Sequence, residues 1–520
     1  MDYFQCNYSE TFEKRPLLKK IPIYDMKNPK KTILNILEDK PVWGPTALEA
    51  RRKASKAYQS KYAEVRQQWI TKNSYYYNAI KRVLQFIVEP GRRVLDIRCQ
   101  TGFFLNATRP SYGVGLETSP EFLEIARRNY PQFEFIMAHP EHLEIGQKFD
   151  YILFENISDT ADIIAALERL KPLCEAKTRL IIYTYNPLWE PIIKLAERFL
   201  KKIPTLEQNW LSEADIRNMF NICGFEWLRT YRTIFFPKRI FLLSTLLNLV
   251  IPRLPVINRL CMINVLVARL DPVPRAPDDI SVSVIVPCKN EKGNIQAAVE
   301  RIPDMGRHTE VIFCDDKSDD GTADEVRRMC KKYPERDIKL IEGPGICKAK
   351  NVWTGFESAQ EDVLMILDAD LTVMPEELPY FFQAIVEGKG ELINGSRLIY
   401  PVPKLAMKFL NMIGNKIFSI IFSSIIGQRI KDTLCGTKVL WRSDWERIKP
   451  MIGSWGIEDQ WGDYELLFGA AKLHLKIVDL PVHYQERVYG TTKMINVFKN
   501  GFKMMLICFG AFKKIKMVIF

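Results

Sequence analysis

Short apolar runs alternate with longer amphipathic or polar segments along most of the chain, in two separate series. The first series lies between residues 75 and 232 and reads RRVLDI, SYGVGLE, FEFIMA, FDYILFE and RLIIYTY. The second begins at Ser281 and reads SVSVIVPCKNE, TEVIFCDD, DIKLIEG, VLMILDAD and ELINGSR. Continuous apolar strands that alternate with helices are typical of a parallel sheet covered on both faces. The pattern therefore predicts an α/β protein with two Rossmann-like domains.

Other segments are apolar without this alternation. Residues 235–270 are strongly apolar but broken by charges and prolines, and the proline-rich stretch 271–279 follows them. Residues 406–426 predict a long helix, and the C-terminal segment mixes apolar residues with several lysines. None contains the uninterrupted run of roughly 20 apolar residues that spans a bilayer. Basic amphipathic helices favour the interface of an anionic membrane, and packing against the domain is the alternative.

These patterns divide the chain into consecutive parts. The prediction is an N-terminal arm over 1–74, a first α/β domain over 75–232, an apolar connector with a linker over 233–279, a second α/β domain over 280–493, and a basic amphipathic segment over 494–520.

The formal net charge of +12 favours a polyanionic partner, which is nucleic acid, an anionic membrane surface or a phosphorylated substrate. No helix-turn-helix, OB-like or RNP pattern accompanies the charge, so nucleic acid is not expected. The eleven cysteines include no C-x-x-C pair, which indicates reduced thiols in a cytosolic compartment. The first residues contain no apolar core, so they do not form a secretion signal. We expect a peripheral or monotopic protein on the cytoplasmic face of a membrane, with no transmembrane helix.

Polar clusters follow the predicted strands of the second domain. VPCKNE ends the first strand, CDDKSDDGT ends the second, and Asp368 and Asp370 follow the buried run LMIL. The carboxyl ends of parallel strands line one crevice of a sheet. So many carboxylates in one crevice would repel one another unless a cation is shared among them. The sequence therefore predicts that Asp368 and Asp370 hold Mg²⁺ or Mn²⁺ against a nucleotide diphosphate.

The second domain also resembles a known family. The motifs VPCKNE, CDDKSDDGT, GPGICK, DADL, NGSR, DTLCGTK and GDYELL occur in this order between Ser281 and Lys493. Together they resemble glycosyltransferase family 2, especially its dolichyl- and polyprenyl-phosphate hexosyltransferases. The resemblance implies a GT-A fold, a nucleotide-sugar donor, a divalent metal and an inverting displacement.

The resemblance also implies roles for individual residues. Those expected to bind the nucleotide sugar are Pro287, Asn290, Glu291, Asp315, Asp316, Lys348 and Asp368. The expected metal ligands are Asp368 and Asp370, and the expected catalytic residues are Asp370, Asp463 and Arg397. Those expected to hold an acceptor phosphate are Arg397, Arg487 and Lys493.

The means of activating the acceptor stays open at this point. A sugar hydroxyl needs a general base, for which Asp463 or Glu465 is the candidate by family analogy. A lipid phosphate has a second pKa of about 6, so it is already anionic near neutral pH and needs only cations to position it. The basic segment ERVYGTTK favours a polyprenyl phosphate or another lipid-linked acceptor.

The first domain contains VLDIRCQTGFF followed by GVGLETSPEFLEIAR. This pair of motifs resembles the class I S-adenosylmethionine-dependent methyltransferases, and the resemblance implies Asp96, Gly102 and Glu117 as cofactor-binding residues. Arg98 and Gln100 stand where the family usually has small residues, and a side chain at such a turn closes a pocket or changes the turn. An active methyltransferase, a cofactor-binding regulator and a structural relic all remain compatible with these residues.

The sequence as a whole predicts a metal-dependent transfer of a hexose from a UDP- or GDP-linked sugar to a lipid-linked acceptor in cell-surface glycan synthesis. S-adenosylmethionine is a further candidate cofactor. The alternatives are a bifunctional enzyme that also methylates, and a non-catalytic scaffold of a polysaccharide assembly complex.

Overall fold

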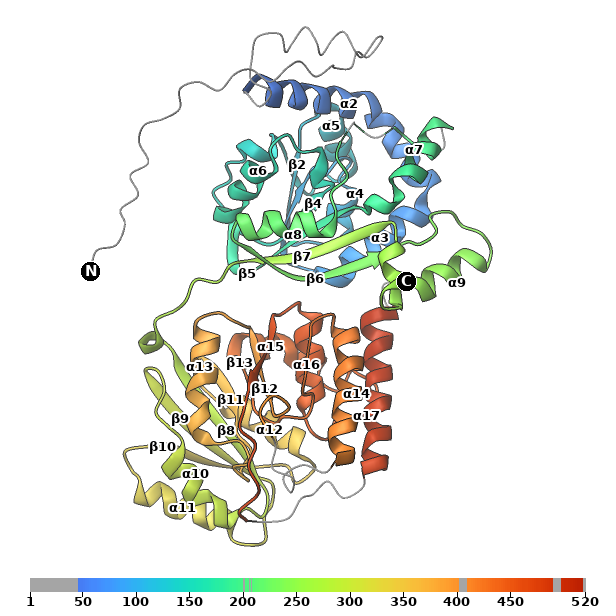
Figure 1. The fold of residues 1–520 in the computed structure, drawn as a ribbon. Coiled ribbons are helices and arrows are strands. Elements are labelled where there is room, and N and C mark those ends of the chain that lie inside the picture. The colour runs from blue at the N-terminus through green and yellow to red at the C-terminus, as the bar shows by residue number, and fades with distance from the viewer. Residues whose placement is uncertain are drawn as a thin grey trace, which may run out of the picture. The chain divides into compact units, whose positions relative to one another are not determined.

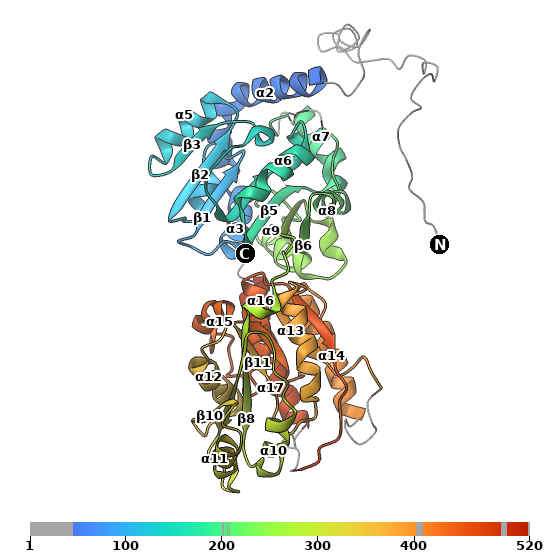
Figure 2. The same cartoon turned by 90° about the vertical axis from the view of Figure 1, so that its left-hand side faces the viewer.

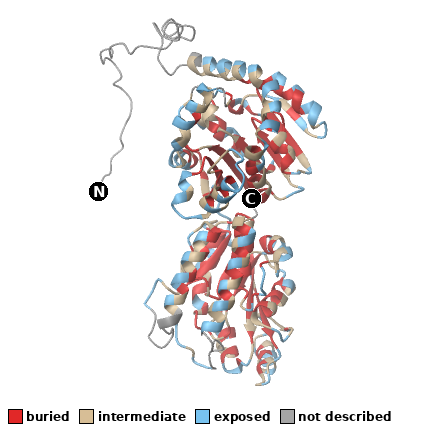
Figure 3. Cartoon of the chain, turned by 90° about the vertical axis from the view of Figure 1, so that its right-hand side faces the viewer, coloured by how far each residue is buried: buried red, intermediate tan, exposed pale blue. Residues whose placement is uncertain are grey.

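The computed structural model describes residues 45–199, 202–204, 206, 208–401, 409–489 and 497–517. It contains two mixed seven-stranded sheets, each flanked by helices (Figure 1). Both sheets belong to one compact unit, Lys56–Phe520. The strands of the two sheets are largely buried (Figure 3). The prediction of two α/β domains is confirmed.

The first sheet has the strand order β3-β2-β1-β4-β5-β7-β6. Its strands are β1 (Arg93–Ile97), β2 (Tyr112–Glu117), β3 (Glu134–Met137), β4 (Phe149–Glu155), β5 (Cys174–Tyr185), β6 (Phe225–Thr233) and β7 (Ile263–Leu270). Its helices are α2 (Pro45–Lys72), α3 (Ser74–Ile87), α4 (Phe103–Ala107), α5 (Pro120–Asn129), α6 (Ile163–Leu170), α7 (Glu190–Arg198), α8 (Glu213–Ile222) and α9 (Leu243–Val250). Alternate strand residues face opposite sides, so Val94 packs with α3 while Leu95 packs with α6 and α8.

Strand β7 corrects one expectation. It lies in the segment 233–279 that the sequence predicts to be a connector, yet it pairs antiparallel with both β5 and β6. All its residues except Leu270 are buried, because it sits between two other strands. The run INVLVARL is therefore a strand of the first sheet, and the connector is shorter than predicted.

The second sheet has the order β10-β9-β8-β11-β13-β12-β14. Its strands are β8 (Ser281–Cys288), β9 (His308–Asp315), β10 (Asp337–Glu342), β11 (Val363–Ile366), β12 (Leu392–Ser396), β13 (Lys438–Trp441) and β14 (Ile477–Pro481). Its helices are α10 (Lys292–Arg301), α11 (Thr322–Lys332), α12 (Lys348–Ser358), α13 (Leu378–Val386), α14 (Phe409–Ile426), α15 (Arg442–Ile448), α16 (Asp463–Lys472) and α17 (Val497–Phe512). Helices α12 and α15 cover one face, and α13 covers the other (Figure 2).

The strand order of the second sheet determines where a ligand can bind. From β8 the chain moves outward through β9 and β10, and then returns to place β11 on the other side of β8. Such a switch in direction leaves a crevice at the carboxyl ends of the two strands, because their following loops diverge. The loops after β8 and β11 carry Asn290 and the pair Asp368 and Asp370.

The two apolar segments predicted at the end of the chain are helices. Helices α14 and α17 pack against each other and correspond to the predicted helix over 406–426 and to the basic C-terminal segment (Figure 1). Within the described ranges, no helix is both long enough and apolar enough to span a bilayer.

Candidate active site

The loops after β8 and β9 hold each other through backbone and side-chain hydrogen bonds. The Asn290 backbone N–H donates to Ser318 Oγ at 2.8 Å, and the Asp319 N–H donates to Asn290 Oδ1 at 3.0 Å. Asn290 has a left-handed φ of 55°, and Lys317 in the neighbouring loop has a φ of 59°. Left-handed non-glycine residues are held in place by their surroundings and cluster at ligand sites. The two loops therefore form one fixed wall of the crevice.

Three of the carboxylates expected at the nucleotide are buried in this wall. Asp316 Oδ1 accepts a hydrogen bond of 2.6 Å from the Gly345 N–H, and Asp315 Oδ2 accepts one of 3.2 Å from the Ser318 N–H. Glu291 Oε2 accepts one of 2.8 Å from Asn294. Pro287, half-buried, is the penultimate residue of β8. The structure places these predicted residues at the carboxyl ends of β8 and β9, and each of the three carboxylates already accepts a hydrogen bond from the protein.

Asp368 forms a 2.5 Å ion pair with Lys348, the first residue of α12. Burial by itself would raise the pKa of Asp368, but Lys348, together with Arg397 and Lys438, lowers it. Burial would likewise lower the pKa of Lys348, but Asp368 and Asp463 raise it. Both groups are therefore charged at neutral pH, and the pair places a cation beside the first carboxylate of the D-x-D motif.

Asp370, the second carboxylate of the motif, pairs with Arg487 at 2.5 Å. The chain around Arg487 reaches this point because it runs beside the residues after Asp370. Val373 and Tyr484 form an antiparallel bridge, and the Gln485 N–H donates to the Thr372 carbonyl at 2.8 Å. The predicted acceptor-phosphate residue Arg487 thus meets a predicted metal ligand.

Gly436 lies directly against Asp368. A Cβ at this glycine would stand 2.2 Å from Asp368 Oδ2, a distance that no real contact shows. The motif DTLCGTK therefore packs its backbone on the carboxylate, and a side chain at Gly436 would force one of the two to move.

Arg397 and Asp432 form an ion pair with two hydrogen bonds. The Arg397 Nε and NH2 donate to the two Asp432 oxygens at 2.7 and 2.9 Å, and Asn415 donates to the same carboxylate at 2.6 Å. Burial would raise the pKa of Asp432, but Arg397 outweighs it and lowers the pKa to about 2. The predicted acceptor residue Arg397 is thus held by a buried carboxylate, and Asp432 braces the loop before β13.

The two candidate bases are in α16. Asp463, its first residue, pairs at 2.7 Å with Lys438, whose side chain is fully buried. Glu465 Oε1 accepts a hydrogen bond of 2.6 Å from the Gly453 N–H, and burial raises the pKa of Glu465 to about 7. Asp459, which the sequence did not single out, caps this helix by accepting from the N–H groups of Trp461, Tyr464 and Glu465.

Some functional contacts were missed from sequence. The contacts of Lys438 with Asp463 and of Gly436 with Asp368 were not predicted, although both residues belong to DTLCGTK. Only Lys438 could have been noticed in the sequence, because it begins a buried strand. Lys493 was predicted to hold the acceptor phosphate and lies outside the described residues. Among the residues that the structure describes, no three or more His, Cys, Asp or Glu side chains gather as a metal-binding group.

Comparison with known proteins bears on this site. Residues 283–445 match the model of the family described as Glycosyl transferase family 2. The second domain is a family 2 glycosyltransferase domain. The match includes the loops after β8, β9 and β11, and it ends before α16 and Arg487.

Two relatives of the glycosyltransferase domain have a lipid phosphate in their names. A dolichol-phosphate mannosyltransferase of Pyrococcus furiosus is 34% identical over 122 residues, which are 23% of this chain and 34% of the relative. An undecaprenyl-phosphate 4-deoxy-4-formamido-L-arabinose transferase of Aeromonas hydrophila is 30% identical over 111 residues, 21% of this chain and 34% of the relative. The chain thus spans about a third of the length of these two curated relatives.

The first domain has distant structural neighbours. A SAM-dependent methyltransferase of Thermotoga maritima aligns over 41% of this chain and 99% of its own, with 17% identity and a TM-score of 0.33. A TM-score this low supports no conclusion about the chemistry of the first domain.

The residues expected to bind S-adenosylmethionine fit that cofactor poorly. Gly102 has the left-handed φ of 77° that a glycine turn requires, but Arg98 and Gln100 have φ of 62° and 50° in the same turn. The buried Arg98 side chain pairs with Asp159 at 3.0 Å. The Glu117 carboxylate, expected at the ribose, accepts N–H bonds from Gln100 at 3.0 Å and from Thr118 at 2.7 Å.

Asp96 completes this set. It is fully buried, and its pKa is raised well above the usual value by burial and by Glu155 and Glu117. Both Asp96 carboxylate oxygens are buried without a hydrogen-bond partner in the described residues, whereas each Glu117 oxygen already accepts one backbone N–H bond. The departure from the expected cofactor site therefore lies in the turn that contains Arg98 and Gln100.

Replacing Gly436 with alanine is expected to destabilise the protein by about 1–3 kcal/mol, because the new Cβ must displace the Asp368 carboxylate or the loop backbone. The midpoint of chemical denaturation measures this loss. Gly414→Ala is the matched control, since a Cβ there meets nothing within 4 Å and alanine favours the helix. Equal midpoints for the two variants would contradict the close packing.

The ion pair of Asp432 predicts a dependence of stability on pH. Its folded pKa of about 2 lies below the unfolded value of about 3.9. The pair therefore stabilises the fold above about pH 4, and this contribution disappears as the pH falls to about 2. Asp432→Asn is expected to cost about 3 kcal/mol at pH 7, because Arg397 stays buried without its partner, and less at pH 3.

Denaturation midpoints of both proteins at pH 7, 4 and 3 test this expectation. Asp324→Asn, which breaks an exposed pair with Arg327, is the control and should change the free energy of unfolding by less than about 0.5 kcal/mol. A difference between wild type and Asp432→Asn that stays constant from pH 7 to pH 3 would show that the carboxylate does not titrate as described.

Proposed function

We propose that this protein transfers a hexose from a UDP- or GDP-linked sugar to a polyprenyl phosphate, or to another lipid-linked acceptor, in the synthesis of a cell-surface glycan. The observation that carries this proposal is the pairing of Asp368 with Lys348 and of Asp370 with Arg487 at the switch point of the second sheet. Two cations and two carboxylates at one crevice suit a reaction in which both the donor and the acceptor carry phosphate groups. The names of the relatives support the lipid phosphate.

The donor diphosphate would lie between Lys348 and the D-x-D motif. In this position Lys348 exchanges part of its pairing with Asp368 for the diphosphate oxygens, as a point charge. Asp368 and Asp370 would hold Mg²⁺ or Mn²⁺, and the ion would supply Lewis-acid stabilisation of the leaving diphosphate. The wall formed by Asn290, Asp315 and Asp316 is proposed to contact the base and ribose.

Arg487 would hold the acceptor. Its guanidinium leaves Asp370 to bind the lipid phosphate, and guanidinium groups bind phosphate through paired hydrogen bonds. A phosphate oxygen then attacks the anomeric carbon while the bond from that carbon to the diphosphate oxygen breaks. The electron pair of the broken bond goes to the diphosphate, and the configuration at the carbon inverts. No proton has to be removed, because the phosphate is already anionic near pH 7.

The geometry supports a phosphate over a sugar hydroxyl as the nucleophile. A hydroxyl would need a base, and Asp463 is held by the buried Lys438 at 2.7 Å. Glu465 has a pKa of about 7 but its carboxylate accepts from the Gly453 N–H. Arg487, by contrast, can exchange one anion for another without a change in protonation. Methylation by the first domain is not proposed, because Arg98 and Gln100 stand in the predicted cofactor turn, where Arg98 pairs with Asp159 and the Gln100 N–H is bonded to Glu117.

Helices α14 and α17 are proposed to hold the protein at the cytoplasmic face of a membrane. Their exposed apolar residues recur every three or four positions: Ile413, Ile417 and Ile420 on α14, and Phe498, Phe502, Met505 and Phe509 on α17. The lysines beside them are Lys416, Lys499, Lys503, Lys513 and Lys514. An apolar helix face flanked by lysines suits the interface of an anionic bilayer. It would also bring Arg487, which precedes α17 in the chain, near lipid phosphates.

Transfer into lipid is the central test. Purified protein with Mn²⁺ or Mg²⁺, labelled UDP- and GDP-hexoses and a polyprenyl phosphate should yield label in the organic phase from one donor. Asp370→Asn should abolish this label. Arg487→Gln should raise the KM for the lipid phosphate by about tenfold or more while the KM for the donor stays similar, since a charged hydrogen bond to phosphate is lost. Donor hydrolysis without label in lipid would exclude the lipid-phosphate acceptor.

Membrane binding is tested by placing a charge on the exposed face of α17. Phe502, which is 67% exposed, is replaced by glutamate. This variant is expected to bind vesicles with anionic lipids about tenfold more weakly, since it loses apolar contact and repels the surface. Val273→Glu, at an exposed apolar residue outside α14 and α17, should bind as the wild type does. Equal sedimentation of both variants with vesicles would contradict a role for α17.

A further inference from the structure

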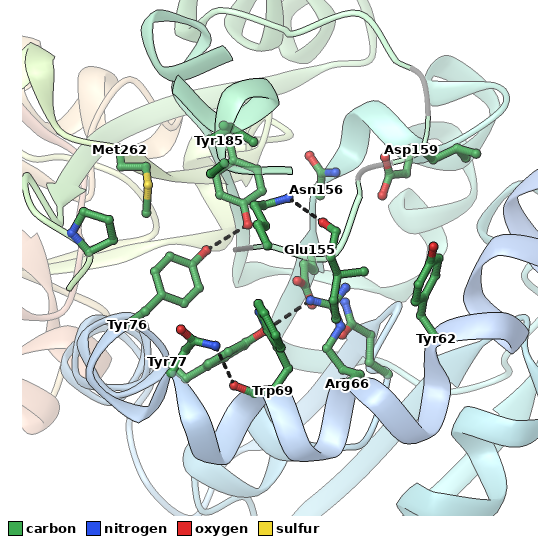
Figure 4. A pocket seen from close by; sticks show the side chains of 18 of the residues that line it. Tyr62, Arg66, Trp69, Tyr76, Tyr77, Glu155, Asn156, Asp159, Tyr185 and Met262 are labelled. Atoms are coloured by element: carbon green, nitrogen blue, oxygen red, sulfur yellow. Dashed lines mark hydrogen bonds between the residues drawn. The ribbon is translucent and has the colours of Figure 1, made fainter. Parts of the chain in front are cut away.

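The first domain contains a pocket of about 350 Å³ at the carboxyl ends of β1 and β4 (Figure 4). In the first sheet β1 lies between β2 and β4, so these ends are also a switch point of an α/β sheet, where ligands bind. The volume is that of a small-molecule site. Helix α2 forms one wall with Tyr62, Arg66 and Trp69, and Glu155 and Tyr185 face them from the sheet (Figure 4).

Two guanidinium groups of this pocket have donors without acceptors. Arg66 NH1 donates to Tyr77 Oη at 3.1 Å, but Arg66 Nε is buried and bonds to nothing in the described residues. Arg98 pairs with Asp159 through NH2, while its NH1 is buried and also lacks a partner there. Both arginines line the pocket, so a ligand with acceptor oxygens would meet guanidinium groups whose hydrogen-bonding capacity the described residues leave partly unused.

Charge in the pocket favours an anion. The lining contains the cations Arg66, Arg98, Lys202 and Lys238 and the acids Glu155 and Asp159, and Lys202 is paired at 2.9 Å with Glu197 outside the lining. Asp159 is already paired with Arg98, and burial raises the pKa of Glu155 to about 7 so that it carries only part of a negative charge at neutral pH. No carboxylate lies within ion-pair distance of Arg66 in the described residues.

The opposite side of the pocket is apolar and continues to the surface. Trp189, Ile192, Ile193, Phe236, Pro237 and Met262 line it. Beyond the lining, Leu195 on α7 is exposed, as is Leu188 just before this helix. Ile192 lines the pocket and is also 54% exposed, so it connects the pocket with the exposed apolar residues of α7. These apolar residues of and before α7 offer contacts for an apolar chain that leaves the pocket.

We propose that this pocket binds an amphiphilic anion, in which a phosphate or carboxylate group is joined to a long apolar chain. The anionic group is bound by Arg66, with Arg98 behind it, and the chain lies against Trp189 and Ile192 toward α7. This ligand class differs from S-adenosylmethionine, whose predicted contacts at Glu117 are occupied by backbone N–H groups. The site is separate from the proposed acceptor site at Arg487 and does not depend on sugar transfer.

Equilibrium dialysis of the full chain with labelled farnesyl phosphate tests the proposal. Because the proposed function predicts a second lipid-phosphate site at Arg487, the decisive protein is Arg487→Met, which should keep one site per chain. Adding Arg66→Met or Ile192→Glu to it should weaken that site by about tenfold or more, since each removes one half of the interaction. Ile192 is half-exposed, so its variant keeps its fold even if Arg66→Met does not.

The controls separate the sources of binding. Ile222→Glu, at an exposed apolar residue of α8 outside the pocket, should leave the site unchanged. Farnesol and inorganic phosphate should each bind about tenfold more weakly than farnesyl phosphate, because each lacks one part of it. Equal binding of inorganic phosphate, or displacement of farnesyl phosphate by S-adenosylmethionine, would overturn the proposal.

Failure of this proposal and failure of the proposed function give different results. If Arg487→Met binds no farnesyl phosphate, the pocket of the first domain is not the site and the inference is wrong. If instead the wild type has a single site that Arg66→Met removes and Arg487→Met leaves intact, that site is the pocket of the first domain, as proposed. The proposed acceptor site in the glycosyltransferase domain is then contradicted.

Discussion

Charge compensation at the carboxyl edge of the second sheet is the constraint on which the candidate active site depends. Parallel strands bring the loops after β8, β9 and β11 to one edge, and these loops carry carboxylates. Two of them, Asp368 and Asp370, are paired with Lys348 from the start of α12 and with Arg487 from beyond β14. Without these cations the carboxylates would repel one another at short distance. The folds of α12 and of the segment after β14 are therefore coupled to the chemistry of the crevice.

The two domains use the same kind of edge in different ways. In the glycosyltransferase domain Asp368 and Asp370 are each paired with a cation from another segment of the chain. In the first domain Arg98 is buried against Asp159, and the neighbouring Glu117 is bonded to backbone N–H groups. What remains beside Arg98 is a pocket with an apolar wall. At one sheet edge the carboxylates are thus paired with cations, and at the other a pocket lies beside a buried ion pair.

Local patterns in the sequence predicted most of the fold and part of the site. The apolar runs of both α/β series are strands, and most of them are buried, whereas the edge strands β3 and β10 are largely half-buried or exposed. Strand β7 was missed because a central antiparallel strand after a long apolar segment looks like a connector until its partners are known. The pairing of Asp370 with Arg487 and of Asp463 with Lys438 could not be predicted either, since these contacts join segments distant in sequence. Residue type indicated the carboxylates, and only the three-dimensional structure shows which cation each one meets.

The close approach of Gly436 to Asp368 has a consequence for how this chain can vary. The position admits only the one amino acid without a Cβ, although it lies on a different loop from the carboxylate that it touches. Any amino-acid substitution at Gly436 would therefore act directly on Asp368, while leaving the D-x-D motif intact in the sequence. A member of the family could lose the correct setting of its acidic pair and still look complete to anyone who reads only its motifs.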